Sequence, residues 1–386
     1  MQVTLIACPF KTSYGAASES LKKALEKKTG TAVEWVASNC GCGDDVEVCR
    51  KFQMPGCKYF DAITITDHPT PKPWKMWLKL QARKFFYYFR ARKYRQLSAG
   101  AEVVNFQQTL NAYGSTALFH WLNQRSQAAR VVTIHELDRH QLARPESNKT
   151  YNKADAIIVQ QGAMKEQLIG LGVDPHRIEI VLHGTDLPAV DDHPAREGIV
   201  FYGGHHPLKG KGLHAVFEAV ALLKTRLGSQ APKLKVHGYF GPEDLAAVKE
   251  LAAQAGLEND VAWFMQIPMP EVFSLYRSSL ACVLPFMGSF AGLAAATAAA
   301  VELPVIATKN AGIPEHLGEN GIWIDDDNAE ALAAAIEKLL GSAELRRDLA
   351  GRLRQRAEQH LSWDIVADKT LAVYERALRR KAAATI

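Results

Sequence analysis

The sequence predicts an α/β protein made of two consecutive doubly wound domains, each built on a parallel sheet. Short apolar runs of strand length alternate with helical patterns along the chain, as is typical of parallel sheets with crossover helices. This alternation occurs in two series, which the Pro- and Asp-containing stretch Leu187–Glu197 separates. The length of 386 residues is sufficient for two domains of ordinary size.

The first series opens with the apolar run Val3–Cys8, which is short enough for a buried parallel strand, and a helical pattern from Ala17 to Lys28 follows it. Its further strands are expected at Ala62–Thr66, Glu102–Phe106, Arg130–Ile134, Ala156–Val159 and Ile178–Val181. The strands of the second series are expected at Ile199–Tyr202, Leu234–His237, Val261–Phe264, Ala281–Leu284, Val305–Ala307 and Ile322–Ile324. The last segment, Ser362–Leu378, has apolar residues at helical spacing.

The composition is that of a soluble globular protein, with 47% hydrophobic and 23% charged residues. The sequence contains no apolar window long enough for a membrane span. The first residues, Met1–Ile6, run directly into a strand pattern rather than a signal peptide. We therefore expect a cytoplasmic protein.

Four of the six cysteines are crowded into residues 38–58, a loop-like segment: Cys40, Cys42, Cys49 and Cys57. Four thiolates in one loop could hold zinc or an iron–sulfur cluster. Their spacing matches no common zinc or ferredoxin pattern, so free or transiently oxidised thiols are the alternative.

An anion site is predicted in Pro285–Thr308, where a strand end, a glycine-bearing loop, an Ala-rich helix and another strand follow one another. Gly288 and Gly292 let backbone amides approach a ligand closely, and the helix presents its positive N-terminus to the same point. A phosphate group is the expected occupant.

A second candidate for phosphate binding is Ile199–Leu213, a strand that runs into a glycine- and lysine-rich turn before a helix. A diphosphate needs cationic groups and close backbone approach, and this turn, which includes Lys211, supplies both. The alternative is a surface turn with solvated lysines.

In order and spacing these two motifs resemble the donor site of GT-B retaining glycosyltransferases of family 4. The resemblance implies two Rossmann-like domains facing across a cleft: an acceptor-side domain at residues 1–188 and a nucleotide-sugar domain at 189–361. It also implies a closing helix at 362–386 that returns to the first domain. The donor-binding residues implied are Gly15, His205, Lys211, Gly288, Ser289, Ala291, Gly292, Leu293 and Thr297. His135, at the end of a predicted strand, corresponds to a catalytic-site histidine directed at the transferred sugar.

Three of these positions depart from the family pattern. Ser289 and Thr297 stand where the family carries two glutamates, and a hydroxyl is shorter and accepts hydrogen bonds less strongly. The donor would lose about 1–3 kcal/mol per contact. His205 stands in place of an arginine, and because imidazole titrates near neutrality, donor affinity would fall as the pH rises.

The resemblance implies retaining transfer of a hexose-type sugar from a nucleotide diphosphate sugar to a glycan or lipid-linked acceptor, as in polysaccharide or glycoconjugate synthesis. It implies that catalysis requires no metal or other cofactor. Two alternatives remain open: a catalytically silent GT-B protein that binds a glycan, nucleotide or partner, and a GT-B protein with a metal or iron–sulfur centre on the four-cysteine loop.

A basic and aromatic segment at residues 72–97 indicates a further partner. No Asp or Glu occurs from His68 to Ala101. Such a segment suits the anionic inner face of a membrane, where each basic residue is worth about 1 kcal/mol. A partly buried helix with a solvated basic face is the alternative. We expect no nucleic-acid partner, because no recognised nucleic-acid module accompanies the segment.

Overall fold

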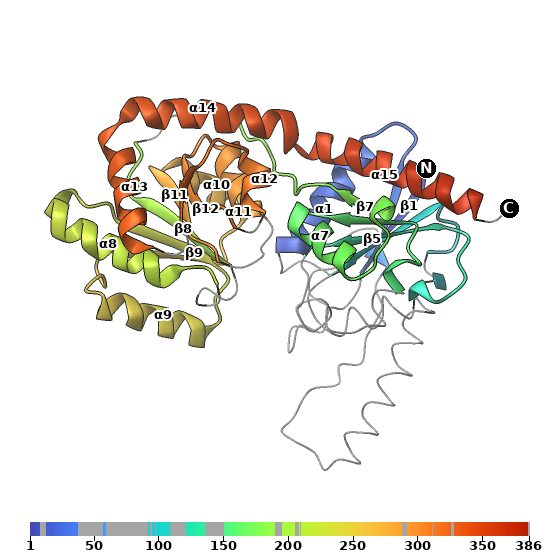
Figure 1. Ribbon diagram of the computed structural model, residues 1–386, viewed down its shortest axis with the longest axis horizontal. Coiled ribbons are helices and arrows are strands. Elements are labelled where there is room, and N and C mark those ends of the chain that lie inside the picture. Colours follow the sequence, from blue (N-terminus) through green and yellow to red (C-terminus); the bar gives the residue numbers. More distant parts are fainter. Residues whose placement is uncertain are drawn as a thin grey trace, which may run out of the picture. The chain divides into compact units, whose positions relative to one another are not determined.

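The computed structural model divides into two compact units, residues 1–181 with 366–386 (unit 1) and residues 182–365 (unit 2) (Figure 1). For residues 13–16, 35–37, 57–58 and 108 the structure describes the backbone alone. In all, it describes residues 1–7, 13–37, 57–58, 92, 95–96, 98–108, 121–135, 150–189, 195–204, 208, 210–287, 292–310, 312–325 and 328–384.

Unit 1 is built on a parallel sheet in which seven strands are described, in the order β3-β2-β1-β4-β5-β6-β7. Their bounds are β1 Gln2–Ala7, β2 Ala32–Ala37, β3 Cys57–Lys58, β4 Val103–Gln108, β5 Ala129–Ile134, β6 Ala156–Val159 and β7 Ile178–Ile180. The helices described in this unit are α1 (Ser13–Glu26), α7 (Gly162–Gly170), the short 3₁₀ helix Pro175–Arg177 and most of α15 (Trp363–Ala383).

Although α15 comes last in the sequence, its residues from Val366 onward belong to unit 1. Its Asp368 pairs with Lys28 at 2.7 Å, just after α1. Further along the helix, Arg376 donates to Glu179 in β7 at 2.9 Å. These contacts hold α15 against the described sheet of unit 1 (Figure 1).

Unit 2 is built on a second parallel sheet in which six strands are described, in the order β10-β9-β8-β11-β12-β13. Their bounds are β8 Ile199–Gly204, β9 Leu234–Gly238, β10 Val261–Met265, β11 Ala281–Leu284, β12 Val305–Thr308 and β13 Ile322–Ile324. The helices of this unit are α8 Leu213–Leu227, the 3₁₀ helix Gly228–Gln230, α9 Pro242–Gln254, α10 Met269–Arg277, α11 Leu293–Ala300, α12 Ile313–Leu317, α13 Ala329–Gly341 and α14 Ala343–His360.

Helices cover both sides of the sheet in unit 2. In Figure 1, α8, α9 and α13 lie on one side, and α10, α11 and α12 lie on the other. This is the arrangement that right-handed crossovers produce when the strand order runs outward in both directions from the first strand. The buried strands are apolar accordingly, and Ile199, Val200 and Phe201 of β8 are all fully buried.

The predicted fold class, two doubly wound parallel-sheet units, is confirmed. Three strands have the expected bounds, and the other expected strands that are described shift by one or two residues at one or both ends. Strand β2 was not predicted, because Glu34 interrupts its apolar run. Helix α1 begins at Ser13 rather than Ala17, and the expected strand Ala62–Thr66 lies outside the described residues.

Within the described part of the chain, no helix combines the length and the apolar character that crossing a membrane requires.

Candidate functional site

The strand order locates a candidate ligand site in unit 2. In doubly wound sheets, ligands bind at the carboxyl ends of the strands where the order reverses direction. In unit 2 this point lies between β8 and β11. The segments that leave these two strands are the turn before α8 and Pro285–Met287, the two motifs predicted to bind phosphate.

The two segments are packed backbone against backbone. The amide of Met287 donates to the carbonyl of Gly210 at 2.9 Å. Gly212 has φ +71°, and a Cβ placed on it would lie 2.2 Å from the carbonyl oxygen of Pro285. Because glycine alone fits this position without strain, it brings the N-terminus of α8 directly beside the exit of β11.

Lys211 supplies a cation at this point. Its side chain is only 8% exposed. The ammonium nitrogen lies 4.0 Å from the ring centroid of Phe286 and 5.7 Å from that of Tyr202. Aromatic faces attract cations, so the two rings hold the ammonium group at the carboxyl edge of the sheet.

Helix α11 begins with a second close approach. A Cβ on Gly292 would lie 2.2 Å from Nδ1 of His316 and 2.7 Å from the carbonyl oxygen of Gly312. The His316 ring donates from Nδ1 to that carbonyl at 2.6 Å, and burial lowers its pKa to about 4, so it is neutral near pH 7. Among the described residues no side chain caps α8 or α11. Their first amides therefore point toward the site.

Thr297 lies on the second turn of α11 and is buried. Its hydroxyl donates to the carbonyl of Leu293 at 2.9 Å, the i−4 bond that threonine often makes inside helices. The single hydroxyl proton is therefore used within the helix, and only the lone pairs of Oγ1 remain for a ligand.

The structure thus brings Lys211, Gly292, Leu293 and Thr297 to the same edge of unit 2. His205, Gly288, Ser289 and Ala291 lie outside the described residues. Gly15 lies in unit 1, in the first turn of α1 rather than in a loop before the helix. The roles assigned to all of these residues stay predictions.

His135 directly follows β5 in unit 1 and is 4% exposed. Its Nε2 is hydrogen-bonded to Oε1 of Gln107 at 2.7 Å. Burial lowers the pKa of His135 to about 3, and the ring is therefore neutral near pH 7. A neutral ring can contact a ligand through hydrogen bonds but not through charge.

Sequence reasoning missed the side chains that hold His135. Asn105, Gln107 and Thr133 are buried polar residues on β4 and β5. They stand at alternate positions of strands that are otherwise mainly apolar, and such a run on one face of a covered sheet is unusual. This alternation was the signal that could have found them.

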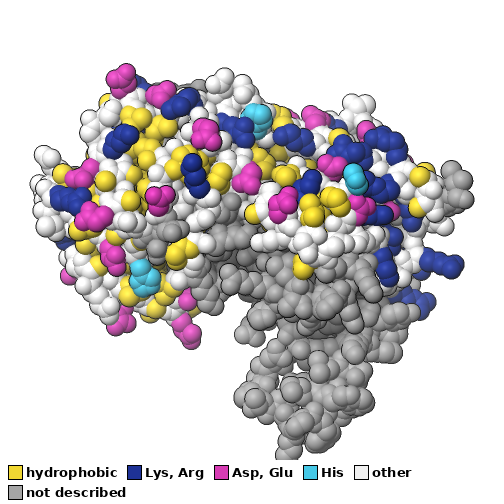
Figure 2. Space-filling view, in the orientation of Figure 1, with side chains coloured by type: hydrophobic (Ala, Val, Ile, Leu, Met, Phe, Trp, Pro, Cys, Tyr) yellow, Lys and Arg dark blue, Asp and Glu magenta, His cyan; other side chains and the backbone are white. Residues whose placement is uncertain are grey.

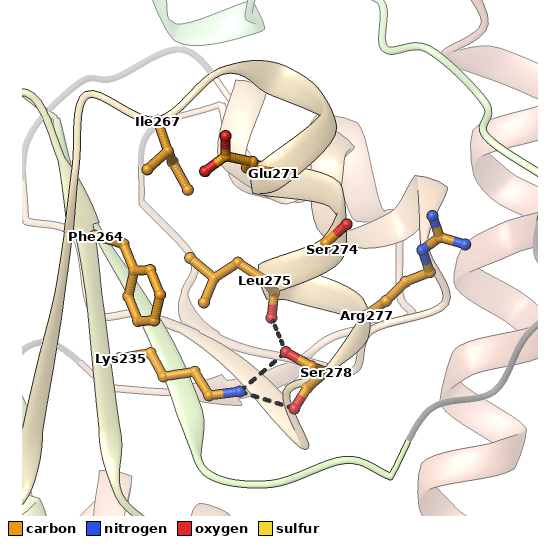
Figure 3. Close-up of a pocket in the computed structure, with 8 residues that line it drawn as sticks. All are labelled: Lys235, Phe264, Ile267, Glu271, Ser274, Leu275, Arg277 and Ser278. Atoms are coloured by element: carbon orange, nitrogen blue, oxygen red, sulfur yellow. Dashed lines mark hydrogen bonds between the residues drawn. The ribbon is translucent and has the colours of Figure 1, made fainter.

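Figure 3 shows a different hollow of unit 2, of about 600 Å³, between β9, β10 and α10. None of the predicted site residues lines it. Its Lys235 donates to the carbonyl of Ser278 at 2.8 Å, to Oγ of Ser278 at 3.1 Å and to Oγ of Ser279 at 3.3 Å. These bonds use the ammonium protons, so Lys235 serves the local structure rather than an anion in the hollow.

The predicted metal loop and membrane segment fall mainly on residues that the structure does not describe. Cys40, Cys42 and Cys49 lie outside the described residues, and the backbone of Cys57 pairs with that of Trp35 in β2. Elsewhere in the described ranges, no cluster of three or more His, Cys, Asp or Glu is positioned to hold a metal ion. Of residues 72–97, only 92, 95 and 96 are described.

Two family models match adjoining parts of the chain. Residues 19–188 match the model described as Glycosyltransferase Family 4. Residues 186–356 match the model described as Glycosyl transferases group 1. The junction of the two matches lies close to the start of unit 2 at Leu182.

Curated relatives share part of the sequence. A D-inositol 3-phosphate glycosyltransferase of Jonesia denitrificans is 30% identical over 226 residues, which cover 53% of this chain and 52% of the relative. An MMP alpha-(1->4)-mannosyltransferase of Mycolicibacterium hassiacum is 26% identical over 235 residues, which cover 59% of this chain and 56% of the relative. The chain thus matches only about half the length of these relatives.

Solved structures share the fold over nearly the whole chain. A glycosyltransferase from Rickettsia africae superposes with a TM-score of 0.72 at 19% identity, covering 98% of this chain and 99% of that one. A sucrose-phosphate synthase from Thermosynechococcus elongatus gives 0.74 at 20% identity, covering 97% and 98%. HepE of Anabaena in complex with UDP and glucose gives 0.69 at 15% identity, covering 96% and 98%.

Proposed function

Since the chain belongs to the GT-B glycosyltransferases and resembles their family 4, we propose that it transfers a sugar from a nucleotide diphosphate sugar to an acceptor hydroxyl. The bond between the anomeric carbon and the donor phosphate breaks, and the acceptor oxygen bonds to that carbon. The acceptor proton passes to the leaving phosphate, so this step needs no metal ion or protein nucleophile, and the anomeric configuration is retained.

The observation that carries the proposal is the position of Lys211 in unit 2. A buried ammonium group lies at the reversal point of the sheet, beside the N-terminus of α8. Gly292 opens α11 along the same edge. Cations and free helix amides together suit a diphosphate, and Lys211 would neutralise its charge as the sugar departs.

The sugar is proposed to be a hexose and the acceptor a glycan or a lipid-linked saccharide. The relatives, an inositol phosphate glycosyltransferase and a mannosyltransferase, support sugar transfer to a hydroxyl-bearing acceptor. In the proposal His135 lines the sugar subsite, and its neutral ring forms a hydrogen bond with a sugar hydroxyl.

A thermal-shift screen against UDP-, GDP- and ADP-sugars tests donor binding. Any hit is followed by assays of nucleotide release and of the anomeric configuration of the product, with and without EDTA. We expect one nucleotide class to stabilise the protein and turnover to survive EDTA. Failure of every nucleotide to bind would overturn the donor site, and an inverted product would overturn retention.

A catalytically silent GT-B protein is the second candidate, and Thr297 favours it. A hydroxyl that already donates to Leu293 stands where the resembled family carries a carboxylate. Donor binding with a measurable dissociation constant but no nucleotide release, with any glycan acceptor tried, would support this candidate over the first.

Two further proposals concern the first domain. Peripheral attachment to an anionic membrane through residues 72–97 is supported by the composition of that segment, since no Asp or Glu occurs from His68 to Ala101. In the described part of unit 1, Lys and Arg side chains also gather around the last turns of α15 (Figure 2). Flotation with liposomes that contain or lack anionic lipid tests it.

A zinc or iron–sulfur centre on Cys40, Cys42, Cys49 and Cys57 is tested by the absorption spectrum and metal content of the purified protein.

A further inference from the structure

Helix α11 has few side chains that could fix the position of its first turn. Apart from Leu293 and Thr297 it consists of alanine, and its residues Ala294–Ala300 are all buried. The first turn is tied to Gly292, whose carbonyl accepts from the amide of Ala296 at 2.9 Å. The direction in which the free amides of α11 point therefore depends on what holds Gly292.

The side chain that holds Gly292 is His316 of the neighbouring helix α12 (Figure 1). His316 is fully buried. A Cβ on Gly292 would lie 2.2 Å from Nδ1 and 2.6 Å from Cγ of its ring, and 2.7 Å from the carbonyl oxygen of Gly312. The Cα of Gly292 thus rests against the ring and against this carbonyl, and a larger residue would displace one of them.

His316 is itself fixed by hydrogen bonds at its side chain and at its backbone. Its Nδ1 donates to the carbonyl of Gly312 at 2.6 Å. Arg356 of α14 donates to the carbonyl of His316 at 3.2 Å and to that of Glu315 at 2.8 Å. The ring against Gly292 is therefore a rigid support rather than a movable side chain.

We propose that His316 is a positioning residue for the donor phosphate. Its ring, held by the carbonyl of Gly312, keeps Gly292 and the first turn of α11 in the place where the free amides meet that phosphate. The inference rests on the proposed function, which gives the amino end of α11 to the diphosphate. Amides that are fixed before the ligand arrives lose less binding free energy to ordering, and they face the phosphate without reorganisation as the sugar departs.

Two properties of His316 carry this role, its shape near the backbone and its hydrogen-bond donor. The ring atoms nearest to Gly292 are Nδ1 and Cγ, and Nδ1 is also the donor to Gly312. Asparagine has a Cγ and an amide nitrogen at the same number of bonds from the backbone, so His316→Asn can keep the contact and the hydrogen bond. Leucine branches at the same carbon without a donor. His316→Leu therefore keeps the shape of His316→Asn and removes the hydrogen bond.

The test compares these two variants by titration calorimetry with UDP, GDP and ADP, and by ligand-observed NMR titration with uridine, guanosine and adenosine. We expect His316→Leu to bind the diphosphate of the preferred base about 10-fold more weakly, because a loosened first turn presents its amides less well. His316→Asn should stay within about twofold of the unmodified protein. In both variants the affinity for the matching nucleoside should change by less than about twofold, because a nucleoside has no phosphate.

A purely structural role of His316 gives a different pattern. His316→Leu would then unfold at a lower urea concentration and would either bind the diphosphate normally or lose diphosphate and nucleoside alike. Either result would overturn the inference. His316→Gln, whose amide lies one bond farther from the backbone, should bind like His316→Leu, which keeps the test decisive if His316→Leu folds poorly.

The same titrations distinguish this inference from the proposed function. If no diphosphate binds the unmodified protein, the proposed function fails and the role of His316 fails with it. If a diphosphate binds the unmodified protein, and His316→Asn and His316→Leu bind it equally well, the donor site stands and the inference alone is wrong.

Discussion

Each unit buries a histidine near the carboxyl end of an interior strand, and the two histidines are held in different ways. His135 in unit 1 bonds to Gln107 and continues into a polar chain. His237 on β9 of unit 2 packs its ring 5.3 Å from that of Tyr202 and 6.2 Å from that of Tyr276, centroid to centroid. Among the described residues neither ring nitrogen of His237 has a hydrogen-bond partner. Burial lowers the pKa of His135 to about 3 and that of His237 to about 4.

The difference extends to the two candidate sites. Unit 1 orders its site through side chains whose donors and acceptors are matched, which suits a directional contact with a hydroxyl. Unit 2 orders its site through close backbone approaches at Gly212 and Gly292 and one buried cation, which suits a phosphate.

The backbone packing of unit 2 is broken most severely by Gly212→Ala. Alanine at position 212 would have to keep a left-handed φ of +71°, and its Cβ would lie 2.2 Å from the carbonyl oxygen of Pro285. We expect the free energy of unfolding to fall by about 4 kcal/mol, from backbone strain and displacement of the β11 exit together. Urea denaturation measures it.

Gly256→Ala is the matched control, because its φ is +69° but no atom lies within 4 Å of the added Cβ. Backbone strain alone should cost about 1 kcal/mol there. Equal losses in the two variants would show that the close approach to Pro285 contributes nothing to the stability of unit 2.

The cation of unit 2 is removed by Lys211→Met, which keeps the apolar stem beside Phe286. We expect the proposed donor to bind about 30-fold more weakly, or about 2 kcal/mol, because a charge-assisted contact with its phosphate is lost. Titration calorimetry measures this. Lys233→Met removes an exposed lysine next to β9 and should leave affinity unchanged. Equal donor affinity of the two variants would show that Lys211 does not contribute to donor binding.

The sequence predicts the fold and part of the unit 2 site, because both depend on local patterns. Alternating apolar runs and helical periodicity locate most described strands within two residues. Lys211 and Gly292 belong to segments whose glycine content indicates close backbone approach before any contact is known. Motif order then brings these segments to the same edge of a parallel sheet.

The polar chain of unit 1 could not be predicted in the same way, because its members are distant in sequence. Gln107 and Thr133 are 26 residues apart, and Asn105 and Tyr374 are 269 residues apart. Periodicity shows that Asn105 shares a face with Gln107, but it does not show which helix covers that face. The partner of Asn105 depends on where α15 packs, which is a tertiary property.

His135→Phe shortens the hydrogen-bonded polar chain of unit 1 at its His135 end. The change removes the ring nitrogen to which Oε1 of Gln107 is hydrogen-bonded, and a buried oxygen without a partner is costly. We expect a loss of about 2 kcal/mol in the free energy of unfolding. Adding Gln107→Leu removes the orphaned oxygen as well, so the double variant should lose less than the sum of the two single variants. Strict additivity in urea denaturation would show that the two side chains are not coupled.

His237→Phe makes the same replacement in unit 2 and should have the opposite sign. Phenylalanine keeps the ring among Tyr202, Tyr239 and Tyr276 and removes two buried ring nitrogens. We expect the variant to be more stable at pH 7 by about 1 kcal/mol, because burying a polar atom without a partner is unfavourable.

The pH dependence of His237→Phe gives an independent check. Because burial lowers the pKa of His237 from 6.5 to about 4, the unfolded chain takes up a proton in this interval and the folded chain does not. This histidine therefore costs the unmodified protein stability as the pH falls from 6.5 toward 4, whereas a phenylalanine, which does not titrate, has no such cost. The advantage of His237→Phe should widen between pH 7 and pH 5 in urea denaturation. A constant or shrinking advantage would mean that the buried ring accepts the proton in the folded state, and the contrast between the two histidines would then fail.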